Sequence, residues 1–155
     1  MARLLVVAGI IFVLDQATKV WVVHLMNLRH VGAIDVWPPY LNFRMAWNHG
    51  VNFGLFASRS EVMRWALVAL ALVISAWVAW WVRREGGRWM EVFGGILIGG
   101  ALGNVVDRVL YGAVADFLNM SCCGITNPYA FNVADIAIFV GAAGLVLAPA
   151  GEKTA

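Results

Sequence analysis

Two aspartates in the last third of the sequence are placed to do acid–base chemistry together. Asp116 follows the stretch Gly112–Ala115, and Asp135 lies one turn into an apolar run that begins at Phe131. Two carboxylates in close contact cannot both ionise easily, so they share one proton. The ionised carboxylate can activate a water molecule, while the protonated one donates to a scissile carbonyl. This is the chemistry of an aspartic protease, which needs no Ser or Cys nucleophile.

Five further polar residues interrupt apolar stretches at helical spacing. Asp15 and Lys19 are four residues apart, so they share one face of a helix. They form either a pair that neutralises itself or one wall of a site, and spacing alone does not choose. Asn104, Asp107 and Arg108 also share one helical face. Three such groups in register, close to further carboxylates, favour a site over a polar helix end.

The surroundings of Asp135 also favour a functional role. Asn132 stands three residues before it, so the two side chains are neighbours on a helix. A helix start favours an anionic carboxylate, and a lone aspartate there is often only a terminal charge. The segment FNVADIAIFVG is otherwise apolar, which argues against a purely solvated side chain. Cys122 and Cys123 are adjacent and have no nearby His, so we expect no metal site.

Composition identifies the elements that must position these residues as membrane helices. The chain has 155 residues, of which 62% are hydrophobic and 13% are charged, and its mean hydropathy is +0.79. Soluble domains have more charge and less apolar content. We therefore expect one integral membrane domain over residues 1–155. The net charge of +2 comes without a basic run, so we expect no nucleic-acid partner.

Four apolar segments are near the length of about 20 residues that crosses a bilayer as a helix. They are Leu4–Leu25, Met63–Val82, Val92–Val106 and Phe131–Ala148. The third is short unless it continues through Leu110. The apolar run of the first segment is not followed by a small-x-small cleavage site, so we expect a retained helix rather than a cleaved signal peptide.

Lys and Arg residues predict the orientation of these helices. The two sides of the membrane carry equal numbers, but Arg83, Arg84 and Arg88 crowd one short loop. Because such density marks the cytoplasmic side, we expect both termini in the cytoplasm. Residues 27–61 and 107–130 then face outward. Asp116 and Asp135 fall at the outer ends of adjacent spans, where they can meet.

The long first outer loop has the pattern of a small β element. Ile34–Val36 and Leu41–Trp47 are typical of short strands, and residues 48–54 are typical of a turn followed by an amphipathic piece. In the third span, Gly95, Gly99 and Gly103 recur every four residues. This spacing lets a neighbouring helix approach closely, and we expect packing rather than chemistry from these glycines.

Five motifs, in order along nearly the whole chain, resemble those of the lipoprotein signal peptidases, or signal peptidase II. Asp15–Lys19 resembles the family's DQxTK element, residues 48–54 its NxGxxFG element, and residues 99–108 its GGAxGNxxDR element. Residues 114–117 resemble VxDF, and residues 131–135 resemble FNxAD. Each motif alone is weak evidence, whereas five in order are strong evidence.

The resemblance implies a membrane aspartic endopeptidase that removes signal peptides from bacterial prolipoproteins, cutting just before a cysteine that carries diacylglycerol. It implies that Asp116 and Asp135 are the catalytic pair. The implied substrate-binding or supporting residues are Asp15, Lys19, Asn48, Gly50, Asn104, Asp107, Arg108, Asn132 and Ala134. The implied fold is an all-α membrane protein, with four transmembrane helices and a small β-cradle in the first outer loop.

The resemblance also implies where the protein works and with what. The expected location is the bacterial plasma (inner) membrane, with the active site near the outer face. The expected partners are diacylglyceryl-modified prolipoproteins and membrane lipid. No cofactor is expected, and a monomer suffices for this chemistry.

Two other classes of protein remain open from the residues alone. An aspartate pair in a membrane could bind a metal ion for lipid-headgroup transfer, although only Arg108 is placed to hold a phosphate. A non-enzymatic scaffold or small transporter could use Asp15 and Lys19 as a structural pair. The metal enzyme predicts loss of activity with a chelator, and the scaffold predicts that asparagine at position 116 or 135 leaves function intact.

Overall fold

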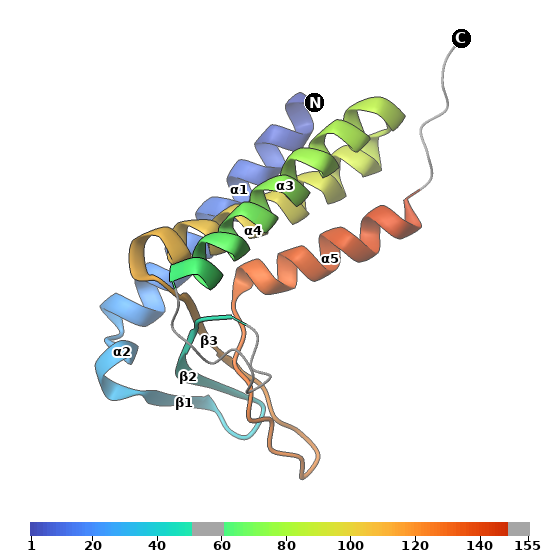
Figure 1. The fold of residues 1–155 in the computed structure, drawn as a ribbon. Coiled ribbons are helices and arrows are strands. Elements are labelled where there is room, and N and C mark those ends of the chain that lie inside the picture. Colours follow the sequence, from blue (N-terminus) through green and yellow to red (C-terminus); the bar gives the residue numbers. More distant parts are fainter. Residues whose placement is uncertain (51–60, 149–155) are drawn as a thin grey trace.

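The computed structural model describes residues 1–50 and 61–148 and is mostly helical. Apolar helices run side by side, with a small sheet at one end of them (Figure 1). Three helices of the described chain are long and apolar enough to span a membrane. They are Ala2–Leu25, which joins α1 (Ala2–Lys19) to the π-helix η1 (Val20–Leu25), α3 (Glu61–Glu85) and α4 (Arg88–Tyr111).

The fourth apolar helix, α5 (Val133–Leu147), is shorter. Its 15 residues extend about 22 Å, against a hydrocarbon thickness of about 30 Å. It begins at Val133 rather than at Phe131, because Phe131 pairs with a strand and Asn132 caps the helix. The helix predicted to end near Val106 continues to Tyr111, since the intervening Asp107 is buried against neighbouring helices.

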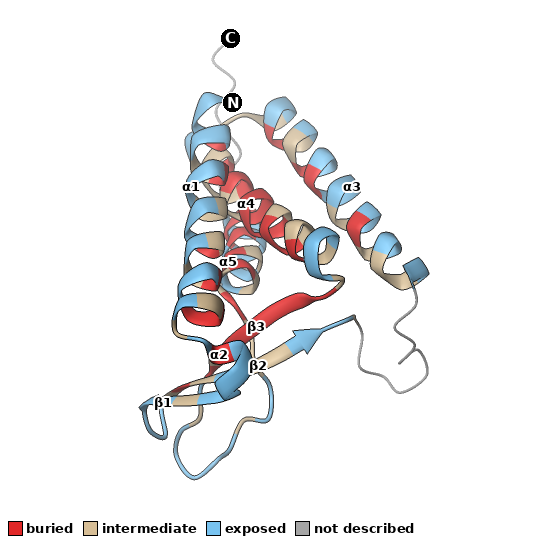
Figure 2. Ribbon diagram, turned by 90° about the vertical axis from the view of Figure 1, so that its left-hand side faces the viewer, coloured by how far each residue is buried: buried red, intermediate tan, exposed pale blue. Residues whose placement is uncertain are grey.

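Helix α4 lies in the middle of the helical layer, and Figure 2 shows its buried face between its neighbours. Glycines make this possible, which confirms the packing role predicted for them. A Cβ atom on Gly99 would lie 2.6 Å from the Ala8 carbonyl oxygen of α1, and one on Gly100 would lie 2.6 Å from the Ala134 carbonyl oxygen of α5. Helices that approach this closely gain van der Waals contact along their backbones.

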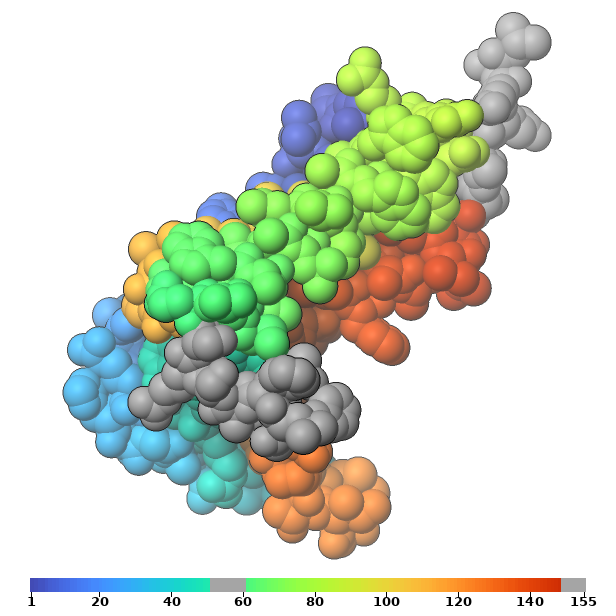
Figure 3. All heavy atoms as spheres, viewed as in Figure 1, coloured from blue at the N-terminus to red at the C-terminus, as the bar shows by residue number. Residues whose placement is uncertain are grey.

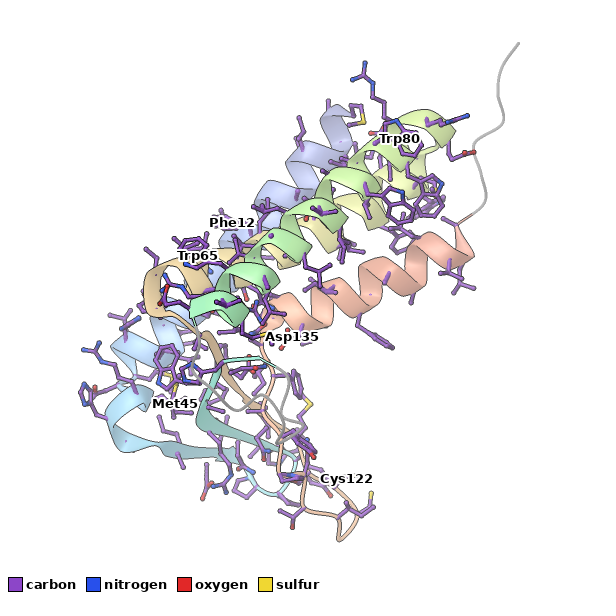
Figure 4. All side chains as sticks on the ribbon, in the orientation of Figure 1. Phe12, Met45, Trp65, Trp80, Cys122 and Asp135 are labelled. Carbon is purple, nitrogen blue, oxygen red and sulfur yellow. The ribbon has the colours of Figure 1, made fainter. Side chains whose placement is uncertain are left out.

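The far end of the helical layer carries the charge and aromatic residues typical of a membrane interface. The N-terminus and the α3–α4 connection lie together at this end (Figure 1). Figure 4 places Trp80 here and Trp65 at the opposite end of α3. Trp77 stacks on Trp81 with ring centroids 5.6 Å apart, and the guanidinium of Arg84 lies 5.5 Å from the Trp80 ring.

The sheet has three antiparallel strands in the order β1 (Ala33–Trp37), β2 (Leu41–Asn48) and β3 (Val114–Asn119). A short helix, α2 (Leu28–Val31), precedes it. The first two strands confirm the prediction for the first outer loop. The prediction that the whole cradle belongs to that loop is wrong, because the third strand comes from the segment after α4.

Strand β3 is buried because it has a partner on both edges. On one side it pairs with β2, and on the other its Leu118 pairs with Phe131 through backbone hydrogen bonds of 2.8 and 3.0 Å. Its sequence, VADFLN, contains an aspartate and an asparagine, which have low strand propensity. Tertiary pairing therefore overrides local preference and places Asp116 on a strand rather than at the end of a helix.

Candidate active site

Asp116 sits in the middle of β3, where it is only 3% exposed. Both of its carboxylate oxygens accept hydrogen bonds from asparagine side chains. Oδ2 accepts from Asn48 Nδ2 at 3.1 Å, and Oδ1 accepts from Asn132 Nδ2 at 2.6 Å. These contacts come from the end of β2 and from the start of α5, so Asp116 lies where three segments meet.

Asp135 lies in the first turn of α5, at the junction of the helices and the sheet (Figure 4). It forms a capping box with Asn132, the residue before the helix. Asn132 Oδ1 accepts from the Asp135 backbone N–H at 2.9 Å, and Asp135 Oδ2 accepts from the Asn132 N–H at 3.3 Å. Asn104 Nδ2 of α4 donates to Asp135 Oδ1 at 2.9 Å. Capping and the helix macrodipole both favour negative charge at this position.

The side chain of Asn132 joins the two aspartates. It is fully buried, it donates to the carboxylate of Asp116, and it accepts from the backbone of Asp135. Because its oxygen is used by the Asp135 N–H, its amide nitrogen must face Asp116. A single residue therefore links the two carboxyl groups that sequence spacing proposed as a pair.

The two aspartates differ in environment. Burial, with a second contribution from the negative charge of Asp135, raises the pKa of Asp116 to about 6. The hydrogen bonds from Asn48 and Asn132 act against this rise, as does the charge of Lys19. A carboxyl with a pKa near 6 is protonated much more often near neutral pH than an ordinary aspartate. The site therefore contains one group suited to donate a proton.

A buried ion cluster, formed by Lys19, Asp15 and Asp107, lies behind the pair. The ammonium of Lys19 is 2.8 Å from a carboxylate oxygen of Asp15 and 2.8 Å from one of Asp107. It also donates to Asn104 Oδ1 at 3.2 Å. Gln16 Nε2 donates to both carboxylates, at 3.1 and 3.2 Å. The cluster joins α1 to α4 inside the protein.

Arg108 faces a different environment, on the side of α3. A pocket of about 390 Å³ opens there between α3, α4 and α5, lined by apolar side chains and by Asn104 and Arg108. Arg108 Nη1 donates to the Asn104 carbonyl at 3.3 Å, and its buried Nε atom has no hydrogen-bond partner among the described residues. The pocket is thus apolar except at Asn104 and Arg108, and Asn104 in turn donates to Asp135.

Residues 48–50 approach the pair from the sheet. Gly50 has a φ of +135°, a conformation that side-chain-bearing residues rarely adopt, and its N–H donates to Asn48 Oδ1 at 3.1 Å. This bond turns the amide nitrogen of Asn48 toward Asp116. The rest of the predicted NxGxxFG element, residues 51–54, lies outside the described residues.

The structure thus brings the predicted site residues into one connected network. Ala134 enters through its backbone N–H, which donates to Asp15 Oδ1 at 2.9 Å. Sequence reasoning missed Gln16, although it stands inside the quoted Asp15–Lys19 motif. Cys122, an exposed thiol like Cys123, lies far from Asp135 on the segment between β3 and α5, which projects from the sheet end (Figures 3 and 4).

Comparison with known proteins identifies the family. A family model described as Signal peptidase (SPase) II matches residues 7–149. The chain belongs to the signal peptidase II family. Members of this family are aspartic-type membrane peptidases that remove signal peptides from prolipoproteins, and this chain is one of them.

Signal peptidase II relatives match along most of their length. The lipoprotein signal peptidase of Methylobacterium sp. (strain 4-46) is 41% identical over 143 residues, which cover 92% of this chain and 86% of that protein. The one from Methylorubrum extorquens (strain PA1) is 42% identical, with 86% and 77% covered. The one from Rhodopseudomonas palustris (strain CGA009) is 39% identical, with 93% and 90% covered.

Solved structures support the same fold for this signal peptidase II. One, described as a bacterial membrane enzyme at 2.3 Å resolution, has a TM-score of 0.78 and 25% identity, and the match covers 95% of this chain and 87% of that one. A second, at 1.9 Å resolution, has a TM-score of 0.79 and covers 95% of this chain and 92% of its own, at 23% identity. Helices and sheet therefore have the arrangement of known membrane enzymes.

Proposed function

We propose that this peptidase uses Asp116 and Asp135 as its catalytic pair and cuts the prolipoprotein just before the diacylglyceryl-modified cysteine. The observation that carries this assignment is the bridge through Asn132, which bonds to Asp116 and to the backbone of Asp135. The negative charge of Asp135 contributes to the raised pKa of Asp116, so the two carboxyl groups interact and can titrate as a coupled pair. The pocket that ends at Asn104 and Arg108 offers apolar surface next to this pair, as a lipidated substrate requires.

In the proposed reaction, Asp116 holds the shared proton and Asp135 is ionised. Asp135 removes a proton from water, whose oxygen bonds to the scissile carbonyl carbon while Asp116 gives its proton to the carbonyl oxygen. The resulting diol collapses and the C–N bond breaks. Asp116 then regains a proton from the diol, and the amine takes the proton that Asp135 holds. The raised pKa of Asp116 and the helix start beneath Asp135 support this division of roles.

We also propose how the chain sits in the membrane. α5 serves as a fourth span, since a short apolar helix can be matched by local thinning of the bilayer. Arg83, Arg84 and Arg88 lie at the end of the helical layer opposite the sheet (Figure 1), so that end faces the cytoplasm and the aspartates lie near the outer face. Residues 1–155 then act as one domain and as a monomer in the bacterial inner membrane.

The remaining members of the network have supporting roles in this proposal. Asn48, with its amide fixed by Gly50, holds the second oxygen of Asp116. Asn104 holds Asp135, and Arg108 provides a cationic end to the apolar pocket. No three His, Cys, Asp or Glu side chains within residues 1–50 and 61–148 are placed to share a metal ion.

The test is cleavage of a synthetic diacylglyceryl-modified prolipoprotein by the full chain in detergent, with the unmodified peptide as a matched substrate. Wild type is expected to cut only the modified peptide, with a chelator present, and to release a fragment that begins at the lipidated cysteine. Asp116→Asn and Asp135→Asn are expected to lose activity while they remain folded. Activity in either variant would refute the catalytic assignment, and inhibition by the chelator would favour a metal enzyme.

A further inference from the structure

The buried ion cluster reaches the backbone immediately before each aspartate of the pair. Asp107 Oδ2 accepts a hydrogen bond of 3.1 Å from the N–H of Ala115, the residue before Asp116. Asp15 Oδ1 accepts one of 2.9 Å from the N–H of Ala134, the residue before Asp135. The two contacts are equivalent in form, although they come from different helices and involve a strand in one case and a helix start in the other.

A single cation connects these two contacts. The Lys19 ammonium lies 2.8 Å from Asp15 Oδ2 and 2.8 Å from Asp107 Oδ2, so it draws the two carboxylates together. Each carboxylate thus binds Lys19 and also holds one backbone N–H. The chain of contacts runs from Ala115 through Asp107, Lys19 and Asp15 to Ala134. It adds a second link between two backbone segments that also meet through Asn132.

The side chains of the cluster are buried. Asp15 is 0% exposed, Asp107 is 1% exposed and Lys19 is 5% exposed. Gly103 closes the cluster on the α4 side, because a Cβ atom there would collide with Asp15 Oδ2. Burying a cation and two carboxylates commonly stabilises a fold less than apolar side chains of the same volume would. Its burial therefore points to a geometric role rather than to stability or substrate contact.

We propose that Lys19, Asp15 and Asp107 are positioning residues that set the separation of Asp116 and Asp135 by holding the backbone N–H before each. This inference rests on the proposed catalytic role of the pair. It gives a specific form to the expectation that these three residues bind substrate or support the site. Loss of one of these two hydrogen bonds lets one aspartate move relative to the other. A misplacement of about 1 Å can lower a catalytic rate by about 100-fold.

Asp107 allows the sharpest test, because an asparagine side chain there can still accept the hydrogen bond from the Ala115 N–H. In Asp107→Asn, the new amide oxygen takes the place of Oδ2 and still accepts from Ala115 and from Lys19, whereas the bond from Gln16 to position 107 is lost because the Gln16 amide nitrogen stays on Asp15. The side chain in Asp107→Ala has no oxygen, so it accepts no hydrogen bond from Ala115 or Lys19. We expect Asp107→Ala to lower kcat by about 100-fold with KM within about twofold, and Asp107→Asn to stay within about tenfold of wild-type kcat.

Ser75→Ala is the matched control, since Ser75 is also buried and its hydroxyl donates to the Ala71 carbonyl within α3, away from the site. Its kcat should be unchanged, because the Ser75 hydroxyl bonds within α3. Equal loss of kcat in both Asp107 variants, or a raised KM with normal kcat, would overturn the positioning role. If Asp107→Ala does not fold, Asp107→Asn decides alone, because a 100-fold loss there also contradicts it. Failure of the proposed function would give a different result. In that case wild type would be inactive on the lipidated peptide, or Asp116→Asn would be active.

Discussion

Replacement of Asp116 by asparagine should abolish activity and, at the same time, stabilise the protein above about pH 6. The side chain is only 3% exposed, and burial together with the charge of Asp135 raises its pKa from 3.8 to about 6. The folded protein therefore binds this proton more tightly than the unfolded chain does. Stability due to this group is present at low pH and is lost as the pH rises from about 4 to about 6.

The size of the effect follows from the same values. A pKa that moves from 3.8 to about 6 corresponds to about 3 kcal/mol of folding free energy lost once Asp116 is ionised. Asparagine avoids this loss but cannot accept from both Asn48 and Asn132, which costs about 1 kcal/mol for one hydrogen bond. The net gain of about 2 kcal/mol at pH 7.5 corresponds to an increase of about 4–8 °C in Tm for a chain of this size.

The assay is thermal unfolding of wild type and Asp116→Asn in the same detergent, at intervals from pH 4 to pH 8. The difference in Tm should grow through the window from pH 4 to pH 6 and then stay constant. Asp135→Asn is the matched control, because Asp135 belongs to a capping box and its replacement should lower Tm. A difference in Tm that is independent of pH, or an Asp116→Asn protein that is less stable at pH 7.5, would show that ionised Asp116 does not destabilise the fold.

Three further predictions concern packing, pH and the bridge. Gly99→Ala should lower Tm by an amount equivalent to about 1–3 kcal/mol, since its Cβ would meet the Ala8 carbonyl, whereas Gly9→Ala, with nothing within 4 Å, should not lower it. If Asp116 donates a proton, kcat should fall as the pH rises through its pKa, so the basic limb of the pH–kcat profile should lie at or above about pH 6; a limb below pH 5 would contradict this. Asn132→Ala should remove a helix cap and the link between the aspartates. We expect it to lower the free energy of unfolding by about 1 kcal/mol and kcat by about 100-fold. An unchanged kcat with a reduced Tm would show that Asn132 only caps the helix.

Local pattern was enough to predict the three long helices and two of the strands. Apolar length identifies α1, α3 and α4, and spacing of four residues places Asp15 beside Lys19 and Gly95 beside Gly99. These are short-range regularities, in which the period of the helix alone decides which side chains share a face. The five motifs likewise indicated the family and its candidate site residues, because a linear pattern can be matched without knowledge of contacts.

Contacts between distant segments could not be derived in this way. Strand β3 forms although VADFLN has weak strand propensity, because β2 and Phe131 satisfy its backbone on both edges. The pairing of Phe131 with Leu118 brings the start of α5 next to β3, so that Asn132 lies against Asp116. The hydrogen bond from the Ala134 N–H to Asp15 joins residues 119 positions apart, and no periodicity along the chain predicts it.

Composition and helical spacing were therefore enough to identify a membrane protein with two candidate aspartates and a set of polar residues on helical faces. How these groups meet depends on the packing of distant segments, which places Asp116 on a strand, Asp135 at a helix start, and Lys19 between two carboxylates. The physical reason is that buried polar groups must find partners within the protein, and those partners are supplied by whichever segments the packing of the glycine-rich helix α4 brings together.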